Sequence, residues 1–78
     1  MSILGVLDRF LRKEKCCEGG VTLVSIGDKL ISGSTVIAEW GEGKMWMIDV
    51  GMEKNTVKRH QRMLVEVCVM KGIEVRSR

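Results

Sequence analysis

The chain has 78 residues, of which 45% are hydrophobic and 29% are charged, and its net charge at pH 7 is +3. A chain this short buries only about 60% of its unfolded surface, so we expect one small domain over residues 1–78. No apolar run approaches the roughly 20 residues of a membrane span, and no basic segment precedes the first apolar residues as in a signal peptide. Since the three cysteines are also an odd number, we expect an intracellular, cytoplasmic protein that does not bind a membrane.

The first 15 residues have the pattern of an amphipathic helix. At 100° per residue, the apolar side chains between Ile3 and Leu11 fill one continuous arc. We expect this helix to run from about Ile3 to Lys15. The segment CCEGG (16–20) then ends it in a flexible turn.

Residues 21–50 have the composition of antiparallel strands joined by short turns. VTLVSI (21–26) is rich in β-branched residues, and GD (27–28) is a two-residue hairpin turn. The segment 29–40 is either one long strand bulged at Gly33 or two short strands. GEG (41–43) forms the next turn, before a strand over 44–50. In that strand Trp46 shares a face with Ile48 and Val50, which favours a core position for Trp46 over a base-stacking one.

A second helix is expected from Asn55 or Thr56 to about Lys71, with Gly72 just past its end. Its inner stripe consists of Val57, Leu64, Val67 and Cys68. IEVRS (73–77) then alternates like a short edge strand. The predicted fold class is therefore α+β, in the order α-β-β-β-α with a possible extra β-strand. An antiparallel meander packs against two helices, which lie on one face.

The segment EKNTVKRHQR (53–62) concentrates positive charge at the start of the second helix. Cations are unfavourable there, because the free N–H groups already give that end a partial positive charge. The same N–H groups can bind a phosphate, so a bound anion would explain the pattern. The alternative is a solvated face in which Arg62 and Glu66 form an i,i+4 ion pair. The candidate phosphate- or nucleic-acid-binding residues are Lys54, Lys58, Arg59, Arg62, Arg76 and Arg78.

Trp40 is a second kind of candidate, because it lies at a strand end beside the GEG turn. An exposed tryptophan at that position can stack on a nucleic-acid base. The element order also resembles that of double-stranded RNA-binding domains. The GD turn of the first hairpin, however, is too short for the loop that such a domain sends into a minor groove.

The residue types that carry metal binding and catalysis do not form a convincing set. His60 and Cys68 would lie about 12 Å apart along one helix, whereas zinc ligands lie within about 2.3 Å of the ion. Cys68 is interpreted as a core residue and His60 as a structural histidine. No serine or cysteine pattern accompanies His60, so no nucleophile–base pair is predicted. We therefore expect no catalytic residues, no metal, no cofactor and no enzymatic activity.

The segment MLVEVCVM (63–70) is apolar nearly all round, which indicates a helix buried on more than one side. A homodimer is expected through the residues outside the inner stripe, Met63, Val65, Val69 and Met70.

Two functions agree with these patterns. The leading one is a small non-enzymatic binding module for a phosphate-bearing partner, either nucleic acid or a nucleotide. The alternative is a protein-interaction module, an accessory regulator or inhibitor, phage- or virus-like, that acts on a larger host or cellular protein machine. Six methionines favour the alternative, because methionine side chains make adaptable binding surfaces.

Overall fold

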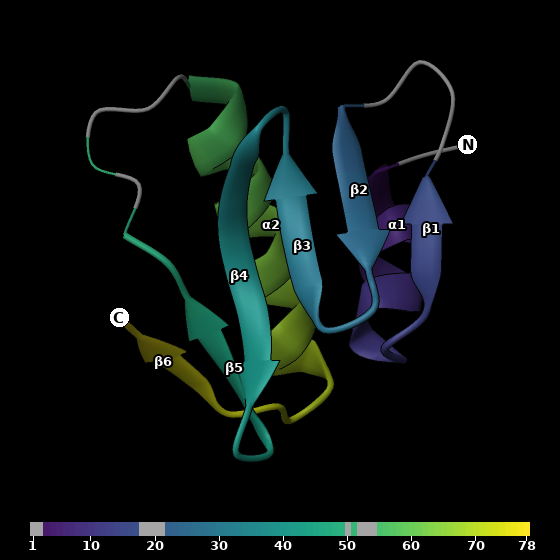
Figure 1. The fold of residues 1–78 in the computed structure, drawn as a ribbon. Helices are drawn as coiled ribbons and strands as arrows, with labels where there is room; N and C mark the ends of the chain where they lie inside the picture. The colour runs from purple at the N-terminus through teal and green to yellow at the C-terminus, as the bar shows by residue number, and fades with distance from the viewer. Residues whose placement is uncertain (1–2, 18–21, 50, 52–54) are drawn as a thin grey trace.

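The computed structural model describes residues 3–17, 22–49, 51 and 55–78 (Figure 1). It confirms the predicted α+β class, with two helices and a six-stranded mixed sheet. The helices are α1 (Ile3–Leu11) and α2 (Asn55–Met70). The strands are β1 (Lys15–Cys17), β2 (Leu23–Ile26), β3 (Lys29–Ser32), β4 (Thr35–Gly41), β5 (Lys44–Met47) and β6 (Val75–Ser77).

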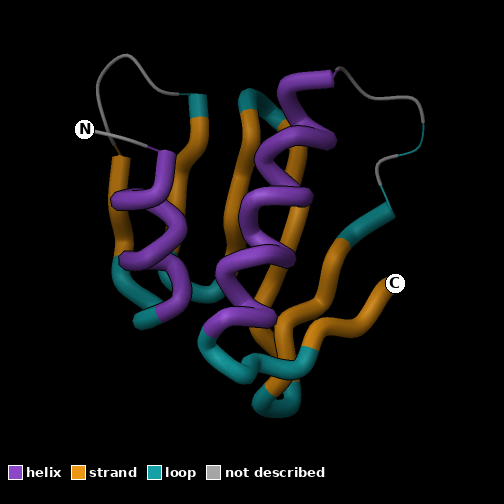
Figure 2. Tube along the Cα trace, turned by 180° about the vertical axis from the view of Figure 1, so that it is seen from behind, coloured by secondary structure: helices purple, strands orange, loops and turns teal. Residues whose placement is uncertain are grey.

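The two helices lie side by side on one face of the sheet, as predicted (Figure 2). The strands follow one another across the sheet in chain order, and each neighbouring pair from β1 to β5 is antiparallel. The last strand, β6, pairs with β5 in parallel. A parallel pair requires a crossover connection, and α2 supplies it by running back along the sheet between β5 and β6. The expected edge strand is therefore present, but the meander ends at β5.

Glycines in the left-handed region make the hairpin turns. Gly27 has φ 105° between β2 and β3, and Gly33 has φ 66° between β3 and β4. The segment 29–40 is therefore two strands rather than one bulged strand. Glu42 and Gly43 both have positive φ between β4 and β5, as a type I′ hairpin turn requires.

The first helix ends earlier than predicted, at Leu11 rather than Lys15. Lys13 has φ 60°, and two hydrogen bonds form a Schellman motif around it: Glu14 N–H to Arg9 O (2.9 Å) and Lys13 N–H to Phe10 O (2.9 Å). A glycine usually occupies this position, so the sequence contained no signal for a helix end near Leu11. Residues 15–17 then form β1, at the edge of the sheet, which buries Cys16 in the core and leaves Cys17 exposed.

The second helix matches its prediction closely. Val57, Leu64 and Cys68 are buried, and Val67 is partly buried against the core. Burial raises the pKa of the Cys68 thiol to about 11, in agreement with its interpretation as a core residue. Gly72 has φ 72° and ends the helix in a second Schellman motif.

Among the described residues, neither helix is long and apolar enough to span a membrane.

The predicted core position of Trp46 is wrong. Met45 is fully buried on the helix side of β5, so its neighbour Trp46 faces the opposite side and is only partly buried. The indole Nε1 of Trp46 donates to Gly41 O (2.9 Å), and the guanidinium of Arg78 lies 4.6 Å from the ring centroid. The ring is thus held on the outer face of the sheet by local contacts.

Candidate functional site

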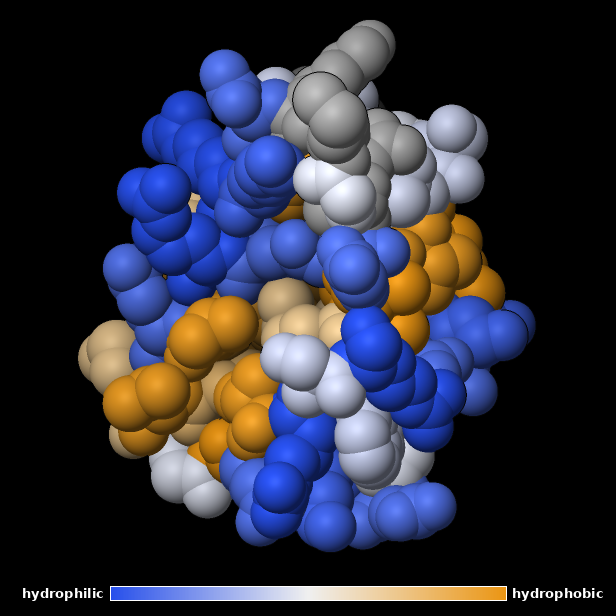
Figure 3. All heavy atoms as spheres, turned by 90° about the vertical axis from the view of Figure 1, so that its left-hand side faces the viewer, coloured by the Kyte–Doolittle hydropathy of each residue, from blue (hydrophilic) through white to orange (hydrophobic). Residues whose placement is uncertain are grey.

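Three basic side chains occupy the outer side of α2. Lys58, Arg59 and Arg62 are exposed, whereas Leu64 on the opposite side is fully buried. Figure 3 shows strongly hydrophilic side chains gathered around the upper part of this helix. Among the described residues none of the three forms an ion pair with a carboxylate, so the Arg62–Glu66 pair of the alternative interpretation is absent. This face, which we call the α2 cation face, carries charges that no described acid neutralises.

The candidate arginines of the C-terminal strand are in a different electrostatic state. Arg76 Nε lies 2.7 Å from Glu74 Oε2, and Lys44 Nζ lies 3.6 Å from the same oxygen. The hydrogen bond from Arg76 is the main cause that lowers the pKa of Glu74. Arg78 pairs with Glu39 and covers the ring of Trp46. Both arginines already have partners, and the remaining candidate, Lys54, lies outside the described residues.

Trp40 is not an open stacking platform. Its indole Nε1 donates to Phe10 O (3.0 Å), and its ring centroid lies 6.3 Å from that of Phe10. Lys13 Nζ lies 5.4 Å from the Trp40 ring centroid, in the geometry of a cation–π contact. A base that stacked on that face of the ring would have to displace Lys13. The stacking role of Trp40 stays a prediction.

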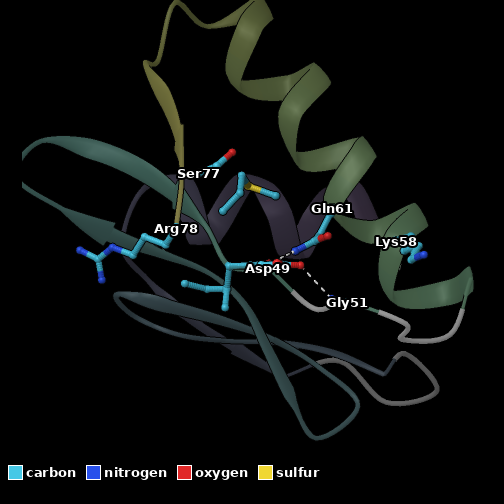
Figure 4. A pocket seen from close by; sticks show the side chains of 8 residues that line it. Asp49, Gly51, Lys58, Gln61, Ser77 and Arg78 are labelled. Carbon is cyan, nitrogen blue, oxygen red and sulfur yellow. Dashed lines mark hydrogen bonds between the residues drawn. The ribbon is translucent and has the colours of Figure 1, made fainter.

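A pocket of about 390 Å³ opens beside the α2 cation face, between α2 and the ends of β5 and β6 (Figure 4). The side chains around it include Met47, Ile48, Asp49, Lys58, Gln61 and Ser77. Arg78 contributes to the wall, but its side chain points away from the pocket (Figure 4). Of the residues predicted from the sequence, only Lys58 and Arg78 thus come together here.

Gln61 fixes one wall of this pocket and was not identified from the sequence. Its side-chain Nε2 donates two hydrogen bonds, to Ile37 O (3.0 Å) and to Ile48 O (2.8 Å). These carbonyl groups belong to β4 and to the segment that leaves β5, so one side chain ties α2 to both. The available signal was a glutamine directly beside the buried stripe of a helix, where a polar side chain needs a partner.

His60 has a hydrogen-bond partner that the sequence did not reveal. Ser32 on β3 places its Oγ 2.8 Å from His60 Nδ1, and both residues are only 2% exposed. Ser32 is 28 residues away in the chain, so the sequence around His60 did not point to it. Ser32 also borders a pocket of about 220 Å³ near the start of α2.

The environment of His60 nevertheless opposes a catalytic role. Burial is the main cause that lowers its pKa, and the charge of Arg59 adds to the effect. A general base must accept a proton, and both causes disfavour the imidazolium that would form. The contact agrees with the interpretation of His60 as a structural residue.

The depressed pKa of His60 predicts a pH-dependent stability. At a pH well above about 6.5, the pKa of a histidine in the unfolded chain, the imidazole is neutral in both states. Its burial then does not reduce the free energy of unfolding through protonation. Below that pH the unfolded chain binds a proton that the folded chain resists, so the free energy of unfolding should fall as the pH drops from about 7 to 5. Urea denaturation at a series of pH values measures this slope. His60→Gln should flatten it between pH 7 and 6, and an unchanged slope would contradict the assignment.

The four residues of the predicted dimer interface lie on two different flanks of α2. At 100° per residue, Val65 and Val69 fall on the flank of Gln61, whereas Met63 and Met70 fall on the opposite flank, with Arg62 between them. Val69 is 69% exposed and Met70 is 85% exposed, while Met63 packs against the core. A single flat dimer contact that includes all four residues would therefore also have to cover the charged Arg62 between the two flanks. The homodimer stays a prediction.

Within the described residues, no group of three or more His, Cys, Asp or Glu side chains is placed to hold a metal ion. Comparison of the chain with known proteins found no matching family model, no matching curated protein and no matching solved structure.

Proposed function

We propose that this chain is a small, non-enzymatic intracellular module that binds a phosphate-bearing partner, a nucleic acid or a nucleotide, through the α2 cation face. One observation carries the proposal: Lys58, Arg59 and Arg62 share an exposed side of α2 without a carboxylate partner in the described part of the chain. Like charges held together near a helix N-terminus repel each other and oppose the helix dipole. A bound phosphate would relieve both effects.

Several of the other cations, unlike these three, have acidic partners within the domain, which supports this choice of face. Arg12 and Lys71 both pair with Asp8, and Arg76 pairs with Glu74. Those cations would have to give up an internal partner before they could bind a phosphate. Arg76 and Arg78 are therefore proposed only as secondary contacts. The free thiols of Cys17 and Cys68 favour the intracellular location, since disulfides are rare in reducing compartments.

Exchanging Lys58, Arg59 and Arg62 together for Gln should weaken nucleic-acid binding and reduce its salt dependence. Each phosphate contact contributes about 0.9 to the slope of log K against log salt on duplex DNA and about 0.7 on single strands. If all three side chains contact phosphates, the slope should fall by about two to three. Fluorescence anisotropy with labelled DNA and RNA, titrated over a range of salt concentrations, measures the change.

A matched control removes three cations elsewhere: Arg12, Lys29 and Lys71, each exchanged for Gln. These side chains are exposed, and the control has the same net charge as the test variant. Equal losses in the two variants would show that net charge, rather than the α2 cation face, determines binding. If the unmodified protein bound no nucleic acid or nucleotide at low salt, the proposal would be abandoned.

A protein-interaction module is the second candidate. It is favoured by the exposed Val69 and Met70 near the end of α2, where Figure 3 shows hydrophobic side chains below the hydrophilic group. Exposed apolar surface is typical of protein contacts, and a partner would have to span the two flanks of α2 on which Val69 and Met70 lie. In that case the partner would be another protein, or a second copy of the chain, and binding would respond to Val69 and Met70 rather than to the α2 cation face.

A further inference from the structure

The pocket beside Lys58 exists because the sheet is wider than its helical layer. α1 contacts β1 and β2, and α2 contacts β4 and β6, but the ends of β5 and β6 extend past the edge of α2 (Figures 1 and 2). The uncovered part of the sheet and the flank of α2 form the walls of the pocket. Its volume of about 390 Å³ lies within the range of roughly 300–1,000 Å³ that is typical of small-ligand sites.

The polar groups of the pocket are mainly hydrogen-bond acceptors. Because Gln61 uses its Nε2 for two carbonyl groups, its remaining atom, Oε1, is an acceptor in a fixed position. Asp49 accepts one bond from Gly51 N–H through Oδ1 (2.9 Å), which leaves its second oxygen for another donor. Ser77 adds an exposed hydroxyl on β6. A ligand that fits these groups must present N–H donors.

The remaining walls are apolar or positively charged. Met47 and Ile48 supply apolar surface, and a methionine thioether packs well against the edge of an aromatic ring. Lys58 stands at the rim, where the pocket meets the α2 cation face. The matching ligand is therefore a flat ring with N–H donors, joined to an anionic group. A nucleotide has this combination.

We propose that this pocket holds one base of a single-stranded nucleic acid, while Lys58, Arg59 and Arg62 contact the phosphates next to it. The inference rests on the proposed function and adds to it the class of partner. A base that is paired and stacked in a duplex cannot enter a pocket without being flipped out, which costs a few kcal/mol. The pocket also supplies the base contact that the two tryptophans do not offer, since Trp40 packs on Phe10 and Trp46 lies under Arg78.

The test compares two strands that carry the same phosphates. One is a short oligo(dC) strand, and the other is a strand of the same length in which every nucleotide is an abasic analogue. The oligo(dC) strand should bind about fivefold more tightly or better, the gain expected from one well-placed base. The same oligo(dC) sequence in a duplex should bind more weakly than the single strand.

The Asp49→Asn variant tests the contact with the base independently of the contacts with the phosphates. The amide oxygen of the new side chain can still accept the Gly51 N–H bond, but a donor replaces the second acceptor. The preference for oligo(dC) over the abasic strand should fall to about twofold or less, because two donors then face each other. Binding of the abasic strand should stay equal or become tighter, since a negative charge near Lys58 is lost. Ser77→Ala, at an exposed position, should reduce the preference without changing thermal stability.

The outcomes distinguish the two proposals. Equal affinity for both strands, lost together in the triple Gln variant, would overturn the base pocket and leave the phosphate-binding function standing. A preference for oligo(dC) that persists in both Asp49→Asn and Ser77→Ala would also overturn the pocket, because the base would then bind elsewhere. Absence of binding by either strand at low salt would overturn the base pocket, and absence of binding to duplex DNA, RNA and nucleotides as well would overturn the proposed function.

Discussion

Exchanging Gln61 for Glu should destabilise the domain by about 2–5 kcal/mol at pH 7. The glutamine donates two hydrogen bonds to Ile37 O and Ile48 O, and a glutamate at this position has only acceptors to offer. Ile48 O would lose the donor from Gln61, at a cost of about 1–3 kcal/mol, whereas Ile37 O would keep its bond from Ile48 N–H (3.0 Å). The negative charge would also repel both oxygens, which adds to the cost. Since Ile48 lines the pocket, loss of its hydrogen bond to Gln61 should disturb the pocket as well.

Urea denaturation followed by circular dichroism measures this cost. Arg62→Glu is a suitable control, because it introduces the same side chain at the next position of α2, on an exposed surface. That change should stay within about 0.5 kcal/mol. Part of the cost at position 61 should disappear in acid, because a protonated carboxyl group has one O–H donor. If Gln61→Glu cost no more than the control, the two hydrogen bonds would not contribute to stability.

Exchanging Phe10 for Ala should remove a large fraction of the stability of the domain and strongly lower its melting temperature. Phe10 is fully buried at the end of α1, where its ring packs against Trp40 and its carbonyl accepts the indole N–H bond. Removing a buried phenylalanine side chain costs about 3–5 kcal/mol. The total stability expected for 78 residues is only about 4–12 kcal/mol.

Thermal unfolding followed by circular dichroism and by tryptophan fluorescence tests the Phe10 prediction. The control is Leu4→Ala on the same helix, whose side chain is 53% exposed and should cost less than about 1 kcal/mol. Similar melting temperatures for the two variants would mean that the side of α1 that carries Phe10 does not pack in the core. A large loss confined to Phe10 would support the observed packing of α1 on the sheet.

The sequence by itself determined the elements whose signals are local. The glycines at 27, 43 and 72 need positive φ, and they mark two hairpin turns and the end of α2. The 3.6-residue period separated the buried Leu64 from the exposed Arg62 before any tertiary contact was known. These predictions succeeded because backbone conformation at a glycine and the orientation of helical side chains depend on near neighbours in the chain.

Tertiary contacts decided the elements that were predicted wrongly or incompletely. The left-handed conformation of Lys13 carries a cost of roughly 1–2 kcal/mol. Pairing of β1 with β2 and the bond from Ser25 Oγ to Glu14 O (2.6 Å) help to offset it. The face of β5 that is buried, and hence the position of Trp46, depended on where the helices pack, because both faces of that strand contain apolar residues. The parallel direction of β6 likewise followed from the path of α2.

For the candidate site, the sequence determined that Lys58, Arg59 and Arg62 share one exposed side of a helix. It did not determine which cations are neutralised, because Arg78 and Glu39 are brought together only by the fold. The Ser32–His60 contact, the two bonds of Gln61 and the pocket with Asp49 and Ser77 also join residues from different elements. A hydrogen bond or a pocket wall depends on distances of a few ångströms between such residues, and only the tertiary structure determines those distances.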